Sequence, residues 1–385
     1  VDAAPTADDV VAIENDSFTW SDPFTTETSS ESRGDLVRGA PLVIGQPVTI
    51  SFRSRIRGAA QAYTSLIRPP QHALLQACGR RGVFTAAVAA TGVATGGAVP
   101  TLASPFAATA SLYNGMPLVA SSGPNNGFTG FIQYYTAGRV AGLVSGAPAA
   151  YTVGDLVALP ANWTYAGTSP RSVADRATDH PSGTLYWYED GKLYKFTGLR
   201  GQVNASGQSA REGFFEWSFT GVFAGDSDAD IPGGLNPLLQ TGPLLLQGSG
   251  ITPAFTVNSA RLPISSFTLA NGGALESPDD PNSLAGFDPA VIGAREPSLT
   301  CDPLATTKAA RDSLGQIQSG SQFPASLYFT GGVGNRFAIT LPKLQRTQAS
   351  PGTRGALRSE QAAFRAMSDG RDANNRDTDS IWCFW

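Results

Sequence analysis

Residues 184–223 read TLYWYEDGKLYKFTGLRGQVNASGQSAREGFFEWSFTGVF, and this stretch decides the fold class. Two apolar, aromatic-rich runs, 185–188 and 193–196, flank an Asp-Gly pair at Asp190 and Gly191. An Asp-Gly pair between alternating apolar runs is typical of a β-hairpin, because the turn requires positive φ angles. The stretch therefore predicts two antiparallel strands joined by a tight turn.

Two more strands are predicted directly after this hairpin, at 199–205 and 214–223. In the second of them Phe215, Trp217 and Phe219 share one face, and polar residues alternate with them on the other. Period-two alternation is the pattern of a half-buried strand. Because the connections are short, an antiparallel meander is the economical topology.

Upstream, residues 48–57 alternate in the same way, with β-branched and aromatic residues on one face. The opposite face carries Arg53, Arg55 and Arg57. Three arginines in a row repel each other unless something neutralises them, so the face is either solvated or paired with acidic groups. We predict these three arginines as candidate contacts with a neighbouring subunit.

Helices are few in the remaining sequence. Further strands are expected at 255–257, 265–269, 326–330, 337–341 and 380–385. Short helices are expected at 71–78, which follows two prolines and ends at a glycine, and at 359–367. With no helix between successive strands, the class is all-β or α+β with an antiparallel sheet.

The organisation of the chain is predicted from local composition. Residues 1–35 are acidic and Ser/Thr-rich, which indicates an extended N-terminal arm that orders against a partner. The Ala/Thr/Gly-rich stretch 85–105 is typical of a connector. Residues 106–167 have a strand pattern of their own, at 109–113, 130–135, 139–144 and 155–159. We interpret 106–167 as a small β module inserted into a core formed by 36–105 and 168–385.

Composition excludes several classes of protein. Charged residues make up 15% of the 385 residues, against about 25% in an average protein, which argues against helical bundles and charge-driven disorder. The net charge of −4 is too near neutral for a protein that grips nucleic acid. No stretch has the ~20 strongly apolar residues of a membrane span, and no secretion signal is recognised, so we expect synthesis in a cytosol.

Motifs for catalysis are not found. His72 and His180 are the only histidines, and no G-x-S-x-G elbow accompanies them. Phosphate-binding and dinucleotide-binding glycine motifs are also missing. Cys78, Cys301 and Cys383 lie far apart, which favours free thiols over a disulfide framework or a zinc cluster. We therefore predict no enzyme, no catalytic residue and no cofactor.

The acidic segments do not predict a metal site. Asp226, Asp228 and Asp230 have the first spacings of a calcium loop, but Ile231 and Pro237 occupy the positions of its glycine and closing glutamate. A pair of carboxylates for glycoside cleavage stays open, because the separation of such a pair is spatial. The candidates are Glu189, Glu212 and Glu216.

The order of several motifs resembles the tail tube proteins of tailed bacteriophages. Residues 184–191, 197–203 and 211–221 are similar to the family's aromatic strand with a D-G turn, its G-x-x-G-N segment and its F-x-F-x-G run. Residue Gln202 stands where an asparagine is frequent in the family.

Three more segments carry the resemblance outward. Residues 48–58 are similar to a V-x-F-x-x-x-x-x-G strand, 74–79 to an L-L-x-A-C-G helix, and 334–342 to a late G-N-x-x-x-x-x-P strand. The motifs occur in the family's order over most of the chain outside the arm and the insert.

The resemblance implies a structural virion protein made in the host cytoplasm. Such proteins fold as a β-sandwich or half-barrel with a flanking helix. They form rings, usually hexameric, that stack through loops and extended arms into a tube around a lumen. The lumen first encloses the tape measure protein and then conducts DNA, which passes without specific binding. Tail terminator or baseplate proteins are the other expected partners, and residues 106–167 would decorate the exterior.

Two alternatives stay open at this point. One is a different virion ring component, such as a baseplate ring or tail terminator, which forms a single ring and does not stack. The other is a monomeric β-rich carbohydrate-binding protein. For that alternative, aromatic residues of the insert stack on sugar rings, the candidates being Tyr134, Tyr135, Trp163 and Tyr165.

Overall fold

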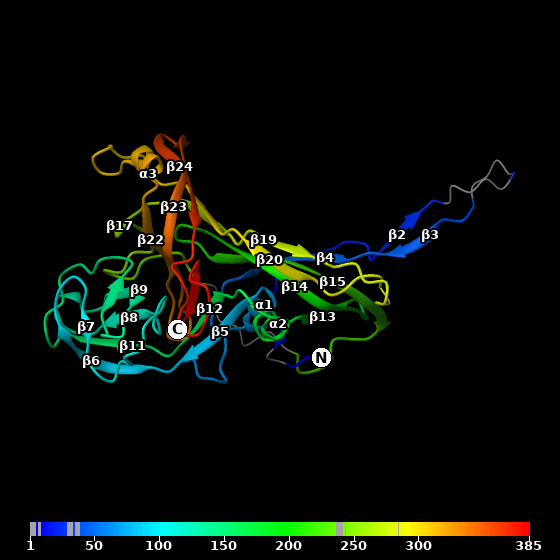
Figure 1. Cartoon of the computed structure of the whole chain (residues 1–385), viewed down its shortest axis with the longest axis horizontal. Helices are drawn as coiled ribbons and strands as arrows, with labels where there is room; N and C mark the ends of the chain where they lie inside the picture. The colour runs from blue at the N-terminus through cyan, green and yellow to red at the C-terminus, as the bar shows by residue number, and fades with distance from the viewer. Residues whose placement is uncertain are drawn as a thin grey trace.

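The computed structural model describes residues 5–6, 9–28, 34, 39–235, 242, 244–283 and 285–385. The architecture is mainly β, with 49% strand and 7% helix, and the sheets are antiparallel. The expected fold class, mainly antiparallel β with few short helices, is therefore confirmed. In Figure 1 one long sheet crosses the molecule, and a smaller sheet lies at its lower left.

The largest sheet curls into a nearly closed barrel. Its hydrogen-bonded path runs in the order β1 (Thr19–Trp20), β4 (Val48–Arg55), β15 (Gly213–Asp228), β14 (Lys192–Gln208), β18 (Ser266–Ala270), β21 (Ser298–Cys301), β24 (Leu357–Ala366), β23 (Phe337–Arg354), β22 (Gln322–Phe329), β16 (Phe255–Val257) and β17 (Ala260–Arg261). Off this path are β13 (Gly183–Glu189) on β14, β25 (Ile381–Phe384) on β23, β12 (Asn162–Gly167) on β25, and β5 (Arg80–Thr85) on β12. Leu245 forms bridges to both Glu212 and Thr330, and so links the start of β15 to the end of β22.

The main hydrophobic core lies inside this curled sheet. Phe215 of β15 packs against Phe337 of β23 and Trp382 of β25, with ring centroids 5.6 Å and 5.2 Å away. All three side chains are fully buried. Because these residues come from strands far apart in the sequence, burial of their aromatic area holds the two sides of the sheet together.

The predicted meander is present in the structure. Strands β13, β14 and β15 pair in sequence order, and the turn residues Asp190 and Gly191 have φ angles of 46° and 77°. The positive φ angles are the reason for the Asp-Gly pair. The separate strand expected at 199–205 belongs to the continuous strand β14, whose register on β15 shifts between Thr197 and Arg200.

The second sheet forms a small barrel with its own core. Its order is β10 (Ala141–Leu143), β9 (Thr129–Tyr135), β8 (Pro117–Ala120), β11 (Leu156–Leu159), β6 (Val88–Thr95) and β7 (Thr101–Leu102). A bridge between Thr101 and Val140 joins the last strand back to the first. Phe131 packs on Tyr328 and Trp385, and so attaches this small barrel to the main sheet.

Three local predictions were wrong. Residues 359–367, expected as a helix, lie mostly in β24, which pairs with β21 and β23 and in which buried Phe364 alternates with less buried neighbours. Residues 109–113, expected as a strand, form turns. The stretch 85–105, interpreted as a connector, contains β6 and β7. Residues 359–367 and 85–105 form strands because they pair with other strands, and residues 109–113 do not join a sheet. In each case pairing between strands outweighs the local pattern.

The remaining elements are short. Two hairpins are formed by β2 (Phe24–Glu27) with β3 (Leu42–Gly45), and by β19 (Gly273–Glu276) with β20 (Val291–Arg295). The α-helices of the described chain are α1 (His72–Ala77), α2 (Val173–Asp179) and α3 (Ser313–Ser319), and a short 3₁₀ helix spans Gly123–Asn125. None of the described helices is long and apolar enough to cross a membrane.

Part of the expected N-terminal arm packs on its own chain. Strand β1 pairs with β4, and the ring of Phe18 stacks on Trp187 with centroids 3.9 Å apart. Residues 1–4, 7–8, 29–33 and 35 of that arm lie outside the described residues. The segment around β1 therefore finds its contacts within the molecule.

Candidate assembly surface

One face of the main sheet is turned away from the core, and we call it the outer face. Strands β4, β15, β14, β18 and β21 alternate between buried side chains and side chains on this face. Its residues are Thr49, Ser51, Arg53, Arg55, Gln202, Asn204, Ser206, Gln208, Phe214, Glu216, Ser218, Thr220, Ser266, Thr268, Ser298 and Thr300. Hydroxyl and amide groups dominate this surface, and few of its side chains carry charge.

Two of the predicted arginines lie beside glutamates of the same chain, Arg55 in close ion pairs and Arg53 in a looser contact. The Arg55 guanidinium donates a 2.6 Å hydrogen bond to Glu14 and lies 3.1 Å from a carboxylate oxygen of Glu212. The hydrogen bond to Glu14 raises the pKa of Arg55. Arg53 lies over the ring of Phe214 at 3.7 Å, and its Nε is 3.9 Å from Glu216. These contacts partly compensate the charges of Arg53 and Arg55 on the outer face.

The third predicted arginine lies apart from these pairs. Arg57 follows the end of β4 and is half-buried. Its Nε has no hydrogen-bond partner among the described residues. The structure therefore brings Arg53 and Arg55 together with glutamates, and leaves Arg57 at the start of the loop that leads to α1.

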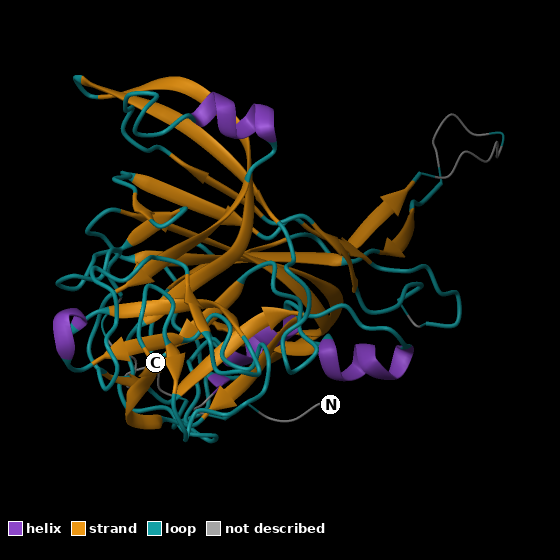
Figure 2. Ribbon diagram, turned by 60° about the vertical axis from the view of Figure 1, so that its left-hand side comes forward, coloured by secondary structure: helices purple, strands orange, loops and turns teal. Residues whose placement is uncertain are grey.

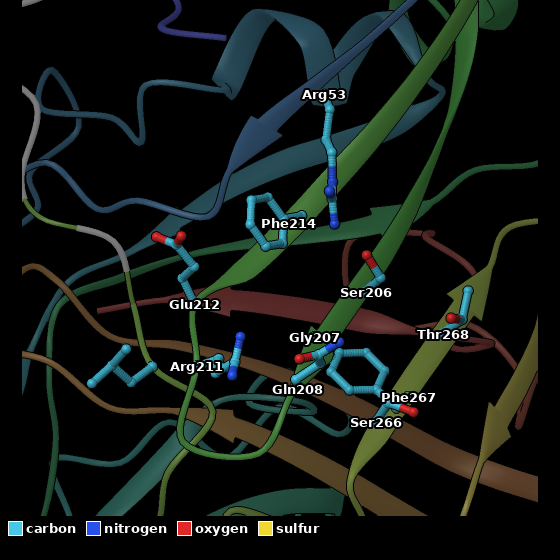
Figure 3. Close-up of a pocket in the computed structure, with 11 residues that line it drawn as sticks. Arg53, Ser206, Gly207, Gln208, Arg211, Glu212, Phe214, Ser266, Phe267 and Thr268 are labelled. Atoms are coloured by element: carbon cyan, nitrogen blue, oxygen red, sulfur yellow. The ribbon is translucent and has the colours of Figure 1, made fainter. Parts of the chain in front are cut away.

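Two grooves open on the outer face. The larger has a volume of about 640 Å³ and lies at the turn between β14 and β15. In Figure 3, Glu212, Arg211 and Phe214 lie on one side of it and Ser266, Phe267 and Thr268 on the other. The smaller groove, about 240 Å³, is lined by β18, β21 and the β23–β24 pair. The sequence pattern did not reveal either groove, because each is formed by strands distant in sequence.

The G-N motif near residue 334 holds two loops together. The Gly58 N–H donates a 2.8 Å hydrogen bond to Asn335 Oδ1, and Asn335 Nδ2 donates to the carbonyl of Gly242. Gly334 has a φ of 70°, and a Cβ there would lie 1.9 Å from the carbonyl oxygen of Gln61. Glycine is therefore required at 334 by both backbone conformation and space.

Both histidine side chains are at least partly buried and make polar contacts with neighbouring residues. A 2.7 Å hydrogen bond joins His72 Nδ1 to the hydroxyl of Tyr165, and burial lowers the pKa of His72 to about 4. His180 Nε2 lies 3.1 Å from the carbonyl of Thr168, and burial also lowers its pKa. Neither contact places a serine or cysteine nucleophile beside an imidazole.

Asp226, from the segment compared with a calcium loop, lies in an ion pair, and the three cysteines are buried. The carboxylate of Asp226 accepts from Lys192 at 2.7 Å, and within the described residues no cluster of three or more histidine, cysteine or carboxylate groups has the geometry for a metal ion. The three cysteines are free and buried, and burial raises the pKa of each thiol, that of Cys301 to about 12. Buried thiols with raised pKa values are poor nucleophiles.

The aromatic residues proposed for sugar stacking are mostly inside the protein. Tyr135, Trp163 and Tyr165 are buried, and Trp163 Nε1 donates to the carbonyls of Thr64 and Ile67. Tyr134 is the exception, with 41% of its surface exposed. A platform of several exposed rings is therefore not formed by these four residues.

The β2–β3 hairpin exposes apolar side chains. Figures 1 and 2 show it projecting from the body of the molecule. Phe24, Leu42 and Val43 are 56%, 64% and 63% exposed. An isolated two-stranded hairpin is at best marginally stable in water, so this one is suited to contact with another surface. Its β-branched run at 43–44 was the sequence signal that could have revealed it.

Comparison with known proteins does not identify a family. No protein-family model matches the chain, and no curated protein matches it.

Proposed function

We propose that this protein is a structural virion protein that self-assembles into stacked rings and forms the tail tube of a bacteriophage. The tube would be the conduit for DNA ejection into the host. The observation that carries the proposal is the outer face, which is rich in hydroxyl and amide groups and on which Arg53 and Arg55 lie beside glutamates of the same chain.

A conduit for DNA requires a surface that does not hold the phosphate backbone. Unpaired lysines and arginines bind phosphates and release counterions, which supplies most of non-specific DNA affinity. On the outer face Arg55 is shared by Glu14 and Glu212, and Arg53 has Glu216 nearby. Neutral polar groups are hydrated and bind weakly to a passing polyanion. The outer face, which is outer only with respect to the core of the subunit, is therefore suited to line the lumen of a tube.

Self-assembly is supported by the β2–β3 hairpin. Its exposed Leu42 and Val43 lie beyond the edge of the main sheet, where a second copy of the chain would cover them. Burial of apolar area is the dominant favourable term in association. A tube of such rings would first enclose the tape measure protein and later conduct the DNA. Terminator or baseplate proteins would bind at the ends of the tube.

The resemblance in the sequence gives the proposal its family. The G-N motif and the Asp-Gly turn both have clear structural roles here, at Asn335 and Asp190. The carbohydrate-binding alternative receives less support, because Tyr135, Trp163 and Tyr165 are buried.

Electron microscopy of the purified protein at increasing concentration tests the proposal. Hollow filaments with a regular axial repeat are the expected result. Isolated rings that never stack would favour the terminator or baseplate alternative. A protein that stays monomeric at every concentration would refute the tube, and a monomer that is retarded on polysaccharide would support the carbohydrate-binding alternative.

A further inference from the structure

The two ends of the long strands β14 and β15 differ in charge. At one end, the β13–β14 turn and the end of β15 present exposed carboxylates, and we call this surface the acidic end. It comprises Glu189, Asp190, Asp226, Asp228 and Asp230. In Figure 1 the β19–β20 loop, with Asp279, Asp280 and Asp288, lies at the same right-hand side of the molecule.

Only part of this negative charge is compensated locally. Lys192 pairs with Asp226 at 2.7 Å. Within the described residues no salt bridge reaches Asp228 or Asp230, and both are exposed. Carboxylates gathered this closely repel each other, so a cationic partner would stabilise the acidic end.

The opposite end of the same strands holds the larger groove with its arginines. Arg53 and Arg211 line it, together with Glu212 and Phe214. Glu212 is engaged by Arg55 at 3.1 Å, whereas exposed Arg211 has no salt bridge in the described part of the chain. The groove therefore offers a guanidinium for a carboxylate from outside.

We propose that the acidic end of one copy docks into the arginine-lined groove of the next copy, so that tube subunits join head to tail along the strand axis. This inference rests on the proposed function and names the contact between copies. Strand β14 has 17 residues, which at about 3.3 Å per residue separates its ends by roughly 55 Å. The two charged surfaces are thus too far apart to meet within one molecule.

A contact of this kind can repeat from copy to copy and so build an extended assembly. A heterologous contact, in which two different surfaces of the same chain meet, repeats in every copy and generates a filament or ring. Arginine is suited to the contact, because its planar guanidinium binds a carboxylate through two parallel hydrogen bonds. The groove lies at the turn after Gln208, at one end of the outer face, so an occupant there leaves the rest of that face uncovered.

Charge reversal tests the contact. The variants are Arg211→Glu, the pair Asp228→Arg with Asp230→Arg, and the chain that carries all three substitutions. Each of the first two should raise the critical concentration for filaments on the order of tenfold or more, as expected for loss of complementary charge pairs. The triple variant again places opposite charges at position 211 and at positions 228 and 230, so its critical concentration should return toward the wild-type value. Arg358→Glu reverses an exposed arginine on β24 and serves as the matched control.

The outcomes separate this inference from the proposed function. Circular dichroism and thermal melting establish that each variant is folded before its assembly is measured. Where a charge-reversed variant does not fold, the neutral substitution Arg211→Gln or Asp228→Asn takes its place. Wild-type filaments with unchanged assembly of the reversed variants would overturn the docking contact and leave the tube standing. Absence of wild-type filaments would overturn both. A third outcome would also overturn the docking contact. If the wild type is retained on a DNA column, and Arg211→Glu assembles normally but is no longer retained, the groove binds phosphate instead.

Discussion

The indole ring of Trp382 lies parallel to the phenyl ring of Phe215, with centroids 5.2 Å apart and an interplanar angle of 7°. The guanidinium of buried Arg80 covers Trp382 at 3.9 Å and donates hydrogen bonds to Asn271 and Ser380. Trp382 lies on β25 and Phe215 on β15, which are not neighbours in the sheet. The stack therefore ties two distant parts of the nearly closed barrel together.

Replacement of Trp382 by alanine should lower the free energy of unfolding by about 3–5 kcal/mol, because it leaves a cavity and removes the ring under Arg80. Urea unfolding of the purified monomer measures this change. The matched control is Leu66→Ala at a side chain 84% exposed, for which a change within about 0.5 kcal/mol is expected. Equal effects of the two substitutions would show that the stack contributes little.

Gly334→Ala should destabilise the protein by roughly 1–3 kcal/mol, because φ is 70° and the new Cβ would lie 1.9 Å from the Gln61 carbonyl oxygen. The control is Gly332→Ala, since a Cβ at Gly332 has no neighbour within 4 Å. Thermal melting of the two variants provides the comparison. If Gly334→Ala melts no lower than Gly332→Ala, the explanation given for the G-N motif is wrong.

Val43→Asp should prevent filament formation without changing monomer stability, because Val43 lies on the β2–β3 hairpin and is 63% exposed. Assembly is followed by sedimentation and electron microscopy, and stability by urea unfolding. Leu314→Asp, at a side chain 70% exposed on α3, is the control for an added charge elsewhere. Filaments of Val43→Asp with wild-type yield would exclude the hairpin from the contact between copies.

Acid should destabilise the protein between about pH 6.5 and pH 4. Burial, and to a smaller extent the charge of Arg68, lowers the pKa of His72 from 6.5 to about 4. Between these values the unfolded chain binds more protons than the native protein, so the free energy of unfolding falls as the pH falls. The lowered pKa of His180 acts in the same direction.

The variant His72→Gln separates these contributions. Glutamine keeps a polar group near Tyr165 and cannot titrate, so the urea midpoint should depend less on pH than in the wild type. Midpoints at pH 7, 5.5 and 4.5 are compared for the two proteins. An identical pH dependence would mean that His72 does not contribute to acid sensitivity.

Much of the fold could be predicted because strand signals are local. The Asp-Gly pair specifies its turn through backbone conformation, and β15 buries Phe215, Trp217 and Phe219 on one face as their spacing predicts. The wrong prediction at 359–367 has the same origin in reverse. Its residues also suit a helix, and only the pairing of β24 with β21 and β23 selects the strand.

The candidate site was predictable only in part. The alternation of 48–57 placed Arg53 and Arg55 on the face opposite the core, and the structure has them there. Their pairing with Glu14, Glu212 and Glu216 depends on the register of β4 on β15 and on the course of the N-terminal segment. Neither is encoded in the spacing of the arginines themselves.

The sequence by itself determined the class of structure, since period-two alternation, turn residues and low charge are properties of short segments. The tertiary structure alone decided what those segments build: a nearly closed barrel with Leu245 linking β15 to β22, a second barrel that includes the supposed connector, and a groove beside Arg211. The physical reason is that burial and hydrogen bonding between strands act between residues far apart in the chain, where local propensity has no influence.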